Sequence, residues 1–350
     1  MPAWIYTGGS PDPSKALTLV HDARRPPSDP LPSDRALVRV TYASLNPADY
    51  KLREMGRVAN YMISRFASGS PGMDFAGVIE ALPPSSSTEF KIGDKVFGRI
   101  MSGALGTYIT PPLSSIVHIP ATLSPLDAST LATAAGTAYE ALVPYVTKGA
   151  GDRVFVNGGS GGVGSFAIQI AARVLGCRVT ASCSAKNVEL CKSLGAEDVI
   201  DYTSSPTAVF DGLRAKGKVF KLVIDNVPSS PSSKNLFEEA DSYMLPSPSS
   251  FYIQVGGGFS LPDMSLLARR TLPPLPFFGA KKPAGVKFKF LLLKQEKREL
   301  VDLGQWMAEG KIRAVLDGDH VYDFADVPKA FERLKTGRTR GKIVVKVSDE

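Results

Sequence analysis

Hydrophobic positions along this chain follow two different patterns. From the N-terminus to about residue 125, short apolar or alternating runs are separated by clusters of Pro, Gly and Ser. This pattern is typical of an all-β region. The expected strands cover residues 36–40, 77–80, 95–97 and 116–119.

From Ser124 onward, strands alternate with helices. Ser124, Pro125 and Asp127 supply a cap, a first-turn proline and an early acid, which together predict a helix start. The alternation that follows predicts a parallel sheet covered by helices on both faces. Its expected strands cover residues 154–156, 179–181, 198–200, 222–225 and 251–255.

The last sixty residues are expected to return to the β-rich part. Their pattern predicts a helix at 300–307, a strand near 314–316, a helix at 327–334 and a strand at 342–347. The expected fold class is therefore α/β, with two domains. A β-rich domain takes residues 1–125 and 286–350, and a doubly wound domain takes residues 126–285.

The glycine-rich stretch within residues 155–169 carries the strongest functional signal. A buried strand at 153–156 leads into the glycines, and an apolar helix follows them and runs to Gly176. Glycines permit a tight turn and leave no Cβ between the free N–H groups of the helix and an incoming anion. The pattern predicts a dinucleotide pyrophosphate site, with an ordinary tight turn as the alternative. The expected contacts are Gly158, Ser160, Gly161, Gly162, Val163 and Gly164.

The next strand, at 178–182, indicates which dinucleotide is bound. A site that prefers NAD usually has Asp or Glu at this strand end, where the carboxylate binds the ribose 2′-hydroxyl. Here hydroxyls and Lys186 follow instead, so NADPH is the expected cofactor. The alternative is a solvated Lys186 in the first turn of the next helix. The candidate contacts at the adenosine end are Ser182, Ser184, Lys186, Asn187 and Tyr202.

Two further strand ends are candidates for binding the nicotinamide carboxamide through their backbone, because doubly wound sheets bind ligands at the carboxyl ends of their strands. They are Asp225-Asn226 and Val255-Gly256-Gly257. Asp225 is alternatively a turn residue. Four aromatic residues are candidates for an apolar substrate pocket or for ordinary packing: Phe66, Tyr108, Phe277 and Phe278.

Composition narrows the class of protein. The chain has 350 residues, of which 43% are apolar, and no apolar run approaches the ~20 residues that cross a bilayer. No signal peptide is evident. Three cysteines, Cys177, Cys183 and Cys191, give no disulfide framework and favour a reducing compartment. We therefore expect a cytoplasmic protein.

The net charge of +7 is mostly dispersed, with one concentration of basic residues. A solvated face is the simpler interpretation, and attraction to an anionic membrane surface is the alternative. No pattern typical of a nucleic-acid-binding module is present. The concentration consists of Lys281, Lys282, Lys287, Lys289, Lys294, Lys297 and Arg298.

Seven short motifs are spaced along the chain, at residues 44–49, 71–79, 93–98, 135–142, the glycine-rich stretch, 194–202 and 340–344. In this order they resemble the medium-chain dehydrogenase/reductase superfamily, in its zinc-independent quinone oxidoreductase branch. The resemblance covers nearly the whole chain. Residues 290–294 and 310–315 resemble the enone-reducing organellar and fungal members in particular.

The resemblance implies a GroES-like catalytic domain joined to a Rossmann-type nucleotide-binding domain. It also implies that no zinc is bound. Where the zinc enzymes have their first ligand this chain has Asn46, and where they have Gly-His-Glu it has Gly72-Met73-Asp74. The composition agrees, because Zn²⁺ needs three or four protein ligands and no cysteine precedes Cys177. The chain has only three histidines, which are interpreted as surface or packing residues: His21, His118 and His320.

The resemblance also places Asn46 near the nicotinamide. Tyr50 and Lys51 follow, and both can donate a hydrogen bond to a developing enolate. The alternatives are packing for Tyr50 and a surface salt bridge for Lys51. Thr137 is implied as a cofactor contact, with helix capping as its alternative.

The expected activity is hydride transfer from NADPH to an activated C=C bond of an α,β-unsaturated carbonyl compound, or to a quinone. The expected partner is a small apolar electrophile (an enone, enal or quinone), with no nucleic acid, and the chain is expected to be a monomer or homodimer. Two alternatives remain open. One is a trans-acting enoyl reductase of a biosynthetic pathway, and the other is a nucleotide-binding scaffold or membrane-associated sorting protein without turnover.

Overall fold

The computed structural model describes residues 1–7, 10, 12–26, 30–54, 69–84, 88–233, 235–257, 261–271 and 283–349. The chain divides into two compact units. Unit 1 contains Met1–Gly136 and Gln295–Glu350, and unit 2 contains Thr137–Lys294. The C-terminal segment from Gln295 thus belongs to unit 1. The boundaries expected from the sequence, after residues 125 and 285, place 126–136 and 286–294 in the opposite units.

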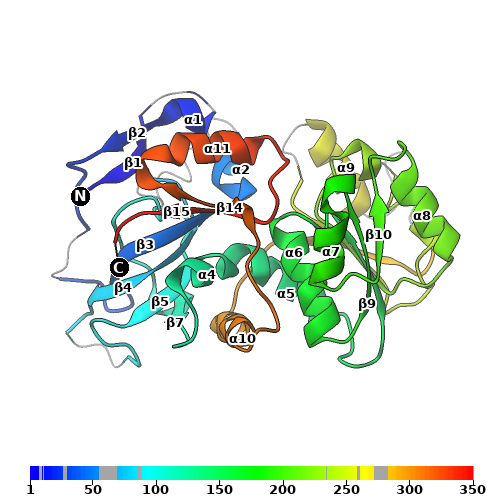
Figure 1. The fold of residues 1–350 in the computed structure, drawn as a ribbon, viewed down its shortest axis with the longest axis horizontal. Helices are drawn as coiled ribbons and strands as arrows, with labels where there is room; N and C mark the ends of the chain where they lie inside the picture. The colour runs from blue at the N-terminus through cyan, green and yellow to red at the C-terminus, as the bar shows by residue number, and fades with distance from the viewer. Residues whose placement is uncertain are drawn as a thin grey trace. The chain divides into compact units, whose positions relative to one another are not determined.

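A mixed sheet forms the centre of unit 1 (Figure 1). Its strands are β3 (Leu37–Leu45), β4 (Asp74–Ala81), β5 (Lys95–Arg99), β6 (Tyr108–Ile109), β7 (Ile116–His118), β14 (Leu316–Asp323) and β15 (Lys342–Lys346). They lie in the order β14-β15-β3-β4-β5-β7, and β6 pairs with β3. The hairpin β1 (Ala3–Tyr6) and β2 (Leu17–Val20) is separate from this sheet. All four strands expected before residue 125 are present, and the C-terminal strand β15 pairs antiparallel with β3.

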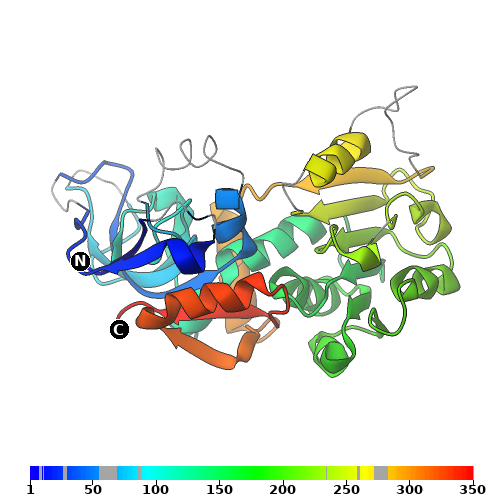
Figure 2. The ribbon, with the colours of Figure 1, turned by 90° about the horizontal axis from the view of Figure 1, so that it is seen from above.

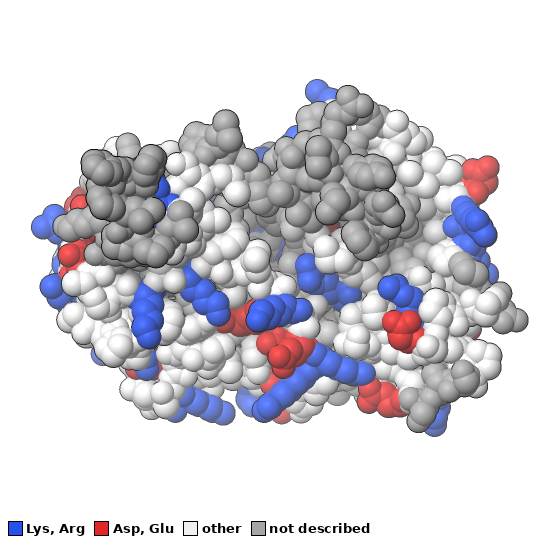
Figure 3. All heavy atoms as spheres, turned by 180° about the vertical axis from the view of Figure 1, so that it is seen from behind, with Lys and Arg blue, Asp and Glu red and all other residues white. Residues whose placement is uncertain are grey.

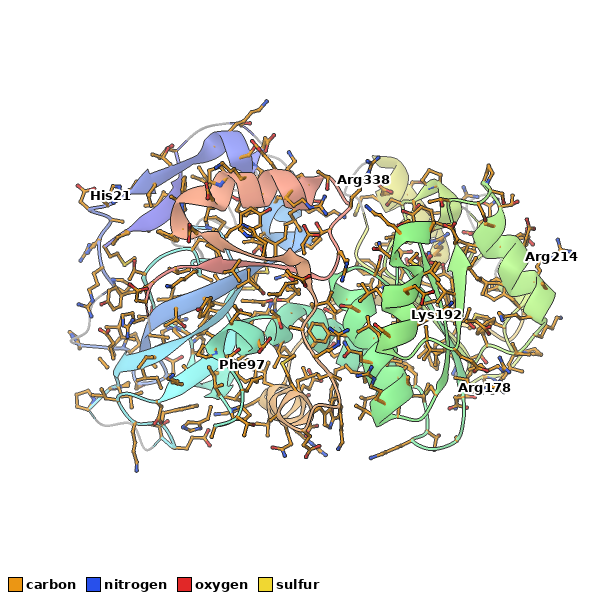
Figure 4. All side chains as sticks on the ribbon, in the orientation of Figure 1. His21, Phe97, Arg178, Lys192, Arg214 and Arg338 are labelled. Atoms are coloured by element: carbon orange, nitrogen blue, oxygen red, sulfur yellow. The ribbon has the colours of Figure 1, made fainter. Side chains whose placement is uncertain are left out.

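The described helices of unit 1 are α1 (Pro13–Ala16), α2 (Pro47–Glu54), α4 (Pro125–Ser129), α10 (Lys297–Ala308) and α11 (Val327–Lys335). Of these, α4, α10 and α11 pack against strands of the sheet, and α1 packs against α11. The expected helix start at Ser124 is confirmed, because its hydroxyl accepts the Asp127 N–H at 3.1 Å. Phe97 is fully buried and faces α10 at Gly304, where a Cβ would lie 3.4 Å from the ring (Figure 4).

Unit 2 contains a six-stranded parallel sheet among its described residues. Its strands are β8 (Arg153–Asn157), β9 (Arg178–Cys183), β10 (Asp198–Asp201), β11 (Leu222–Asp225), β12 (Phe251–Val255) and β13 (Lys287–Leu291). They lie in the order β10-β9-β8-β11-β12-β13. The chain therefore builds outward from β8 in both directions, so the carboxyl end of β8 is the topological switch point where such sheets bind ligands.

Helices and apolar packing bury this sheet on both faces. The helices are α5 (Gly136–Leu142), α6 (Gly162–Gln169), α7 (Val188–Leu194), α8 (Ala208–Lys216) and α9 (Leu261–Thr271). On one face, Phe155 and Tyr252 pack in a cluster with Leu213 of α8. Their neighbours along the strands point to the other face and are also fully buried: Val154, Val156 and Ile253. Figure 2 shows α9 beside the edge strand β13, which the sequence pattern did not predict. The expected α/β class with a doubly wound parallel sheet is confirmed.

Candidate functional site

The glycine turn after β8 is shaped by close backbone contacts. Gly158 has a φ of 75°, which a side chain would strain. A Cβ on Gly164 would lie 2.2 Å from the Gly158 carbonyl oxygen, so only glycine lets α6 begin directly against the turn. Gly161 differs, because its Cβ would meet only the Gly158 oxygen, at 3.5 Å. Space therefore remains in front of the helix.

The N-terminus of α6 fits an anionic group. Gly161 is the N-cap residue, and among the described residues no side chain caps the helix. The first N–H groups of a helix lack backbone partners inside it, and together with the helix dipole they attract negative charge. The turn at Gly158–Gly164 thus has the open, cationic character that a dinucleotide pyrophosphate requires.

Ser182 lies beneath this turn rather than beside it. It is 1% exposed, and its hydroxyl accepts the Gly158 N–H at 3.0 Å and donates to Asn157 Oδ1 at 2.5 Å. With its hydrogen already used, Ser182 acts on the candidate cofactor site by holding the glycine turn in place.

Asp225 is also turned inward. Its Oδ1 accepts from Asn157 Nδ2 at 2.8 Å and from the Val227 N–H at 3.2 Å, and its Oδ2 accepts from the Tyr252 hydroxyl at 2.7 Å. Burial raises the pKa of Asp225, while these hydrogen bonds oppose the shift. Ser182, Asn157, Asp225 and Tyr252 come from β9, β8, β11 and β12, so this polar ladder crosses four adjacent strands. The first three lie at or next to the carboxyl ends of their strands, whereas Tyr252 is the second residue of β12 and reaches Asp225 through its hydroxyl.

Asn226, directly after the ladder, has an unused acceptor. Its Nδ2 donates to the Asn157 carbonyl at 2.8 Å. Its Oδ1 is buried and has no hydrogen-bond partner among the described residues. Buried polar atoms are normally paired, so this oxygen is suited to receive an amide N–H from a ligand at the strand ends.

The adenosine-side candidates come together at the end of β9. Asn187 Nδ2 donates to Ser160 Oγ at 3.1 Å and to Ser184 Oγ at 3.3 Å. Lys186 is exposed, and Tyr202 is 42% exposed. The nearest strand, β10, ends in Asp201, whose carboxylate accepts from Thr203 at 2.6 and 2.9 Å.

A small cavity of about 140 Å³ lies at the end of β12. Its lining is mainly apolar and includes Pro228, Leu267 and Phe290, while its polar side chains are Ser229, Gln254 and Asp263. Gln254 Nε2 donates to the Gly256 carbonyl at 3.3 Å, and Gln254 Oε1 accepts from the buried Arg270 at 3.0 Å. The Gln254 side chain therefore links the candidate segment Val255–Gly257 to the buried Arg270.

In unit 1, Asn46 precedes α2 and anchors its first turn. The Asn46 N–H donates to Asp49 Oδ2 at 2.7 Å, which is one half of a capping box, and Pro47 occupies the first helical position. The Asn46 side chain turns into the sheet instead. Its Nδ2 donates to Asp74 at 2.9 Å, and its Oδ1 accepts from Lys342 at 2.6 Å.

The remaining candidates differ in their surroundings. Tyr50 packs against the core of unit 1, Lys51 is half-buried on α2, and Thr137 is 7% exposed at the start of α5. Tyr108 lies under the Arg25 guanidinium, whose carbon is 3.9 Å from the ring centroid. Phe66, Phe277, Phe278, Gly258, Lys281 and Lys282 lie outside the described residues.

Sequence reasoning did not select several residues that organise these sites. Examples are Asn157, Asp74 and Lys342, each of which lies within one of the seven motifs without being a candidate site residue. A polar residue at the last position of an apolar strand was the available signal for Asn157. No local signal distinguishes Lys342 from an exposed lysine.

The histidines have ordinary surroundings. His118 pairs with Asp94 at 2.9 Å, His320 packs edge-on against Tyr322, and His21 is exposed. No group of three or more His, Cys, Asp or Glu residues able to hold a metal ion occurs in the part of the chain that the structure describes.

Among the described residues, no helix is long and apolar enough to span a membrane. On the face in Figure 3, basic residues lie among acidic ones.

Two family models match the chain. The model described as alcohol dehydrogenase GroES-like domain matches residues 32–121, and the model described as zinc-binding dehydrogenase matches residues 194–345. The GroES-like character expected for unit 1 is confirmed by the first match.

Known proteins match over the full length. The trans-enoyl reductase pgmF of Aspergillus terreus is 37% identical over 365 residues, which cover 100% of this chain and 97% of that protein. The 2-methylene-furan-3-one reductase of Solanum lycopersicum is 30% identical over 361 residues, covering 99% and 79%. The solved structure of the quinone oxidoreductase from Coxiella burnetii has a TM-score of 0.79 and 29% identity, covering 99% of each chain.

Asp49 gives unit 1 a testable pH dependence. Burial, and to a lesser degree the neighbouring Asp74, raise the pKa of Asp49 to about 7 from 3.8, against the hydrogen bond from Asn46 and the charges of Lys342 and Arg99. The folded state therefore holds a proton that the unfolded state has lost, and the free energy of unfolding falls as the pH rises from about 4 to about 7. A pKa that differs by one between the folded and unfolded states corresponds to ~1.4 kcal/mol of stability.

We expect Asp49→Asn to remove much of this fall, because the amide oxygen keeps the bond to Asn46 without a charge. Urea unfolding at pH 5 and pH 8 measures it, with the exposed Asp22→Asn as control. An equal loss of stability with pH in Asp49→Asn and the wild-type protein would contradict the assignment.

Proposed function

Because this chain belongs to the medium-chain dehydrogenase/reductase superfamily, in its quinone oxidoreductase and enone reductase branch, we propose that it is an NADPH-dependent, zinc-independent reductase. Its proposed substrates are small apolar electrophiles: α,β-unsaturated carbonyl compounds reduced at the C=C bond, or quinones. The observation that carries the proposal is the glycine turn at the switch point of unit 2, where Gly161 leaves the N-terminus of α6 open to an anion.

The preference for NADPH rests on the residues after β9. No carboxylate occurs between Ser182 and Asn187, and Lys186 is exposed in this segment, which supports its proposed role in binding a 2′-phosphate. Ser160, Ser184 and Asn187 already form one hydrogen-bonded group there. The acceptor Oδ1 of Asn226 suits the carboxamide at the nicotinamide end.

The zinc independence rests on the residues at the corresponding positions of unit 1. Asn46 directs its carboxamide to Asp74 and Lys342, so it has no free atom for a metal. Met73 is 2% exposed, and its sulfur accepts from Arg99 at 3.8 Å. A neutral thioether beside a guanidinium is a poor Zn²⁺ ligand, because zinc prefers thiolate, imidazole and carboxylate.

The protein's share of the reaction is orientation and charge stabilisation. Bound NADPH supplies a hydride from its nicotinamide ring. Lys51 and Tyr50 are the proposed donors to the carbonyl oxygen, where negative charge develops when hydride reaches the β-carbon. Asn46 fixes the first turn of the helix that carries both donors.

A second candidate function, within the same chemistry, is that of a trans-acting enoyl reductase serving a biosynthetic pathway. The observation that favours it is the 37% identity to trans-enoyl reductase pgmF over all of this chain. Such an enzyme should reduce carrier-bound enoyl groups faster than free enones.

A cytoplasmic location is also proposed, because all three cysteines are free, buried thiols.

The test of the proposed function is oxidation of NADPH and NADH, followed by absorbance of the reduced nicotinamide, with a chelator present. The panel contains enones, enals, quinones, simple ketones and carrier-bound enoyl thioesters. We expect chelator-resistant turnover with NADPH on enones, quinones or enoyl thioesters. Loss of turnover with the chelator would contradict zinc independence, and tight NADPH binding without turnover would favour a scaffold.

Gly161→Val should abolish NADPH binding without unfolding unit 2, because the new side chain fills the space in front of α6 and meets little protein. Calorimetric titration and urea unfolding measure the two effects. Gly164→Ala provides the contrast, since its Cβ at 2.2 Å from a backbone oxygen should lower stability. NADPH binding by Gly161→Val at wild-type strength would refute the placement of the pyrophosphate.

Lys186→Ala should weaken NADPH binding about tenfold or more and NADH binding by less than about twofold, because only NADPH has a 2′-phosphate to lose a charged hydrogen bond. Fluorescence titration of both cofactors measures the ratio. Lys192→Ala is the matched control, since Lys192 lies on the next helix and pairs with Glu189 at 3.0 Å (Figure 4). Equal weakening of both cofactors would place Lys186 outside the phosphate site.

A further inference from the structure

Asp74 is the first residue of β4 and is fully buried, yet its carboxylate receives five donors. Its Oδ1 accepts from the Thr133 N–H at 3.1 Å and the Thr133 hydroxyl at 2.5 Å. Its Oδ2 accepts from Asn46 Nδ2 at 2.9 Å, and more weakly from Ser44 at 3.4 Å and Lys342 at 3.5 Å. These hydrogen bonds offset the cost of burying the carboxylate.

The shortest hydrogen bonds to the Asp74 carboxylate come from two different segments, through Thr133 and Asn46. Asn46 directly precedes α2, which carries Tyr50 and Lys51. Thr133 lies in the π-helix at Leu131–Ala135, which continues directly into α5 and Thr137. A π-helix adds a residue to a turn and is often found at functional sites. Asp74 therefore fixes, with one side chain, the two segments that lead to the proposed donor and cofactor residues.

Lys342 completes the cluster from the last strand. It is 2% exposed, and its Nζ donates to Asn46 Oδ1 at 2.6 Å and to the Leu45 carbonyl at 3.2 Å. Burial lowers the pKa of Lys342, and the charges of Asp74 and Asp49 oppose the shift. Gly341 makes this approach possible, since it has a φ of 72° and a Cβ there would lie 2.1 Å from the Val315 oxygen.

The contacts to Asn46 are directional. Its Oδ1 faces a cation and its Nδ2 faces an anion, so a flipped carboxamide would place like groups together at both ends. The pair of charges selects one orientation of Asn46 and, through the Leu45 carbonyl, fixes the backbone just before α2.

We propose that Asp74 and Lys342 are positioning residues for the reduction, holding the Asn46 carboxamide and the starts of α2 and the π-helix in the arrangement that hydride transfer requires. This inference rests on the proposed function. In the proposed reaction neither Asp74 nor Lys342 contacts the substrate, and both act through Asn46 and Thr133.

The central test separates position from stability. Lys342→Met leaves the Asp74 carboxylate without its cation and should destabilise unit 1. The double variant Asp74→Asn/Lys342→Met removes both charges, so it should recover stability relative to Lys342→Met. Its kcat for NADPH-dependent reduction should nevertheless stay at least tenfold below wild type, with the NADPH dissociation constant changed less than twofold. A double variant that is folded and has wild-type kcat would overturn the proposal.

A second readout does not depend on activity. The chain has six asparagines, so selective ¹⁵N-asparagine labelling gives six side-chain amides to follow by NMR, and a seventh, from position 74, in the double variant. The Asn46 amide, assigned by Asn46→Asp, should shift and lose protection from exchange in the double variant. It should be unchanged in Lys346→Met, which removes an exposed lysine from the same strand.

The outcomes are distinguishable. If no substrate is reduced, the proposed function fails, and the amide signal still reports whether the charges orient Asn46. An unchanged Asn46 signal in the double variant would overturn the proposal. If the variants at 342 do not fold, Thr133→Val takes their place, with an expected severalfold loss of kcat and unchanged NADPH affinity. Wild-type kcat in Thr133→Val would then contradict the proposal.

Discussion

A carboxylate removed from water must be surrounded by hydrogen-bond donors, and each unit of this protein is organised around one such group. In unit 1 it is Asp74, and in unit 2 it is Asp225; both are fully buried. An unpaired buried charge is too costly to persist, so the donors around each aspartate are held to definite places. In both units those donors belong to the segments from which the candidate binding residues project.

The two aspartates are stabilised in different ways. Asp74 has Lys342 in contact and five donors, whereas Asp225 receives neutral donors from Asn157, Val227 and Tyr252 and only a through-space attraction from Arg270. Burial accordingly raises the pKa of Asp225. The consequence for function is the same, because a backbone turn or a carboxamide that is fixed before the ligand arrives need not be ordered on binding.

Structural features could be predicted from the sequence wherever the residues that determine them are close together in the chain. The helix start at Ser124 and the strand–glycine–helix turn after β8 depend on neighbours, and both were predicted. The inward direction of Ser182 and Asp225 was not, because it depends on which strands are adjacent. Lys342 donates to a carboxylate 268 residues away, and lysine is normally exposed, so no local pattern reveals its role. Strand β13 was missed although its alternation of lysine with phenylalanine is typical of a half-buried edge strand.

The ladder of Ser182, Asn157, Asp225 and Tyr252 also restricts how this protein can change by single mutations. Each member has partners that only a few side chains could satisfy, so replacing one leaves another buried polar atom unpaired. Intermediates along a stepwise route would be less stable than either end, and the members can be exchanged readily only as a set. Exposed positions such as Lys186 carry no such epistasis, so they can change one at a time while the sheet beneath remains the same.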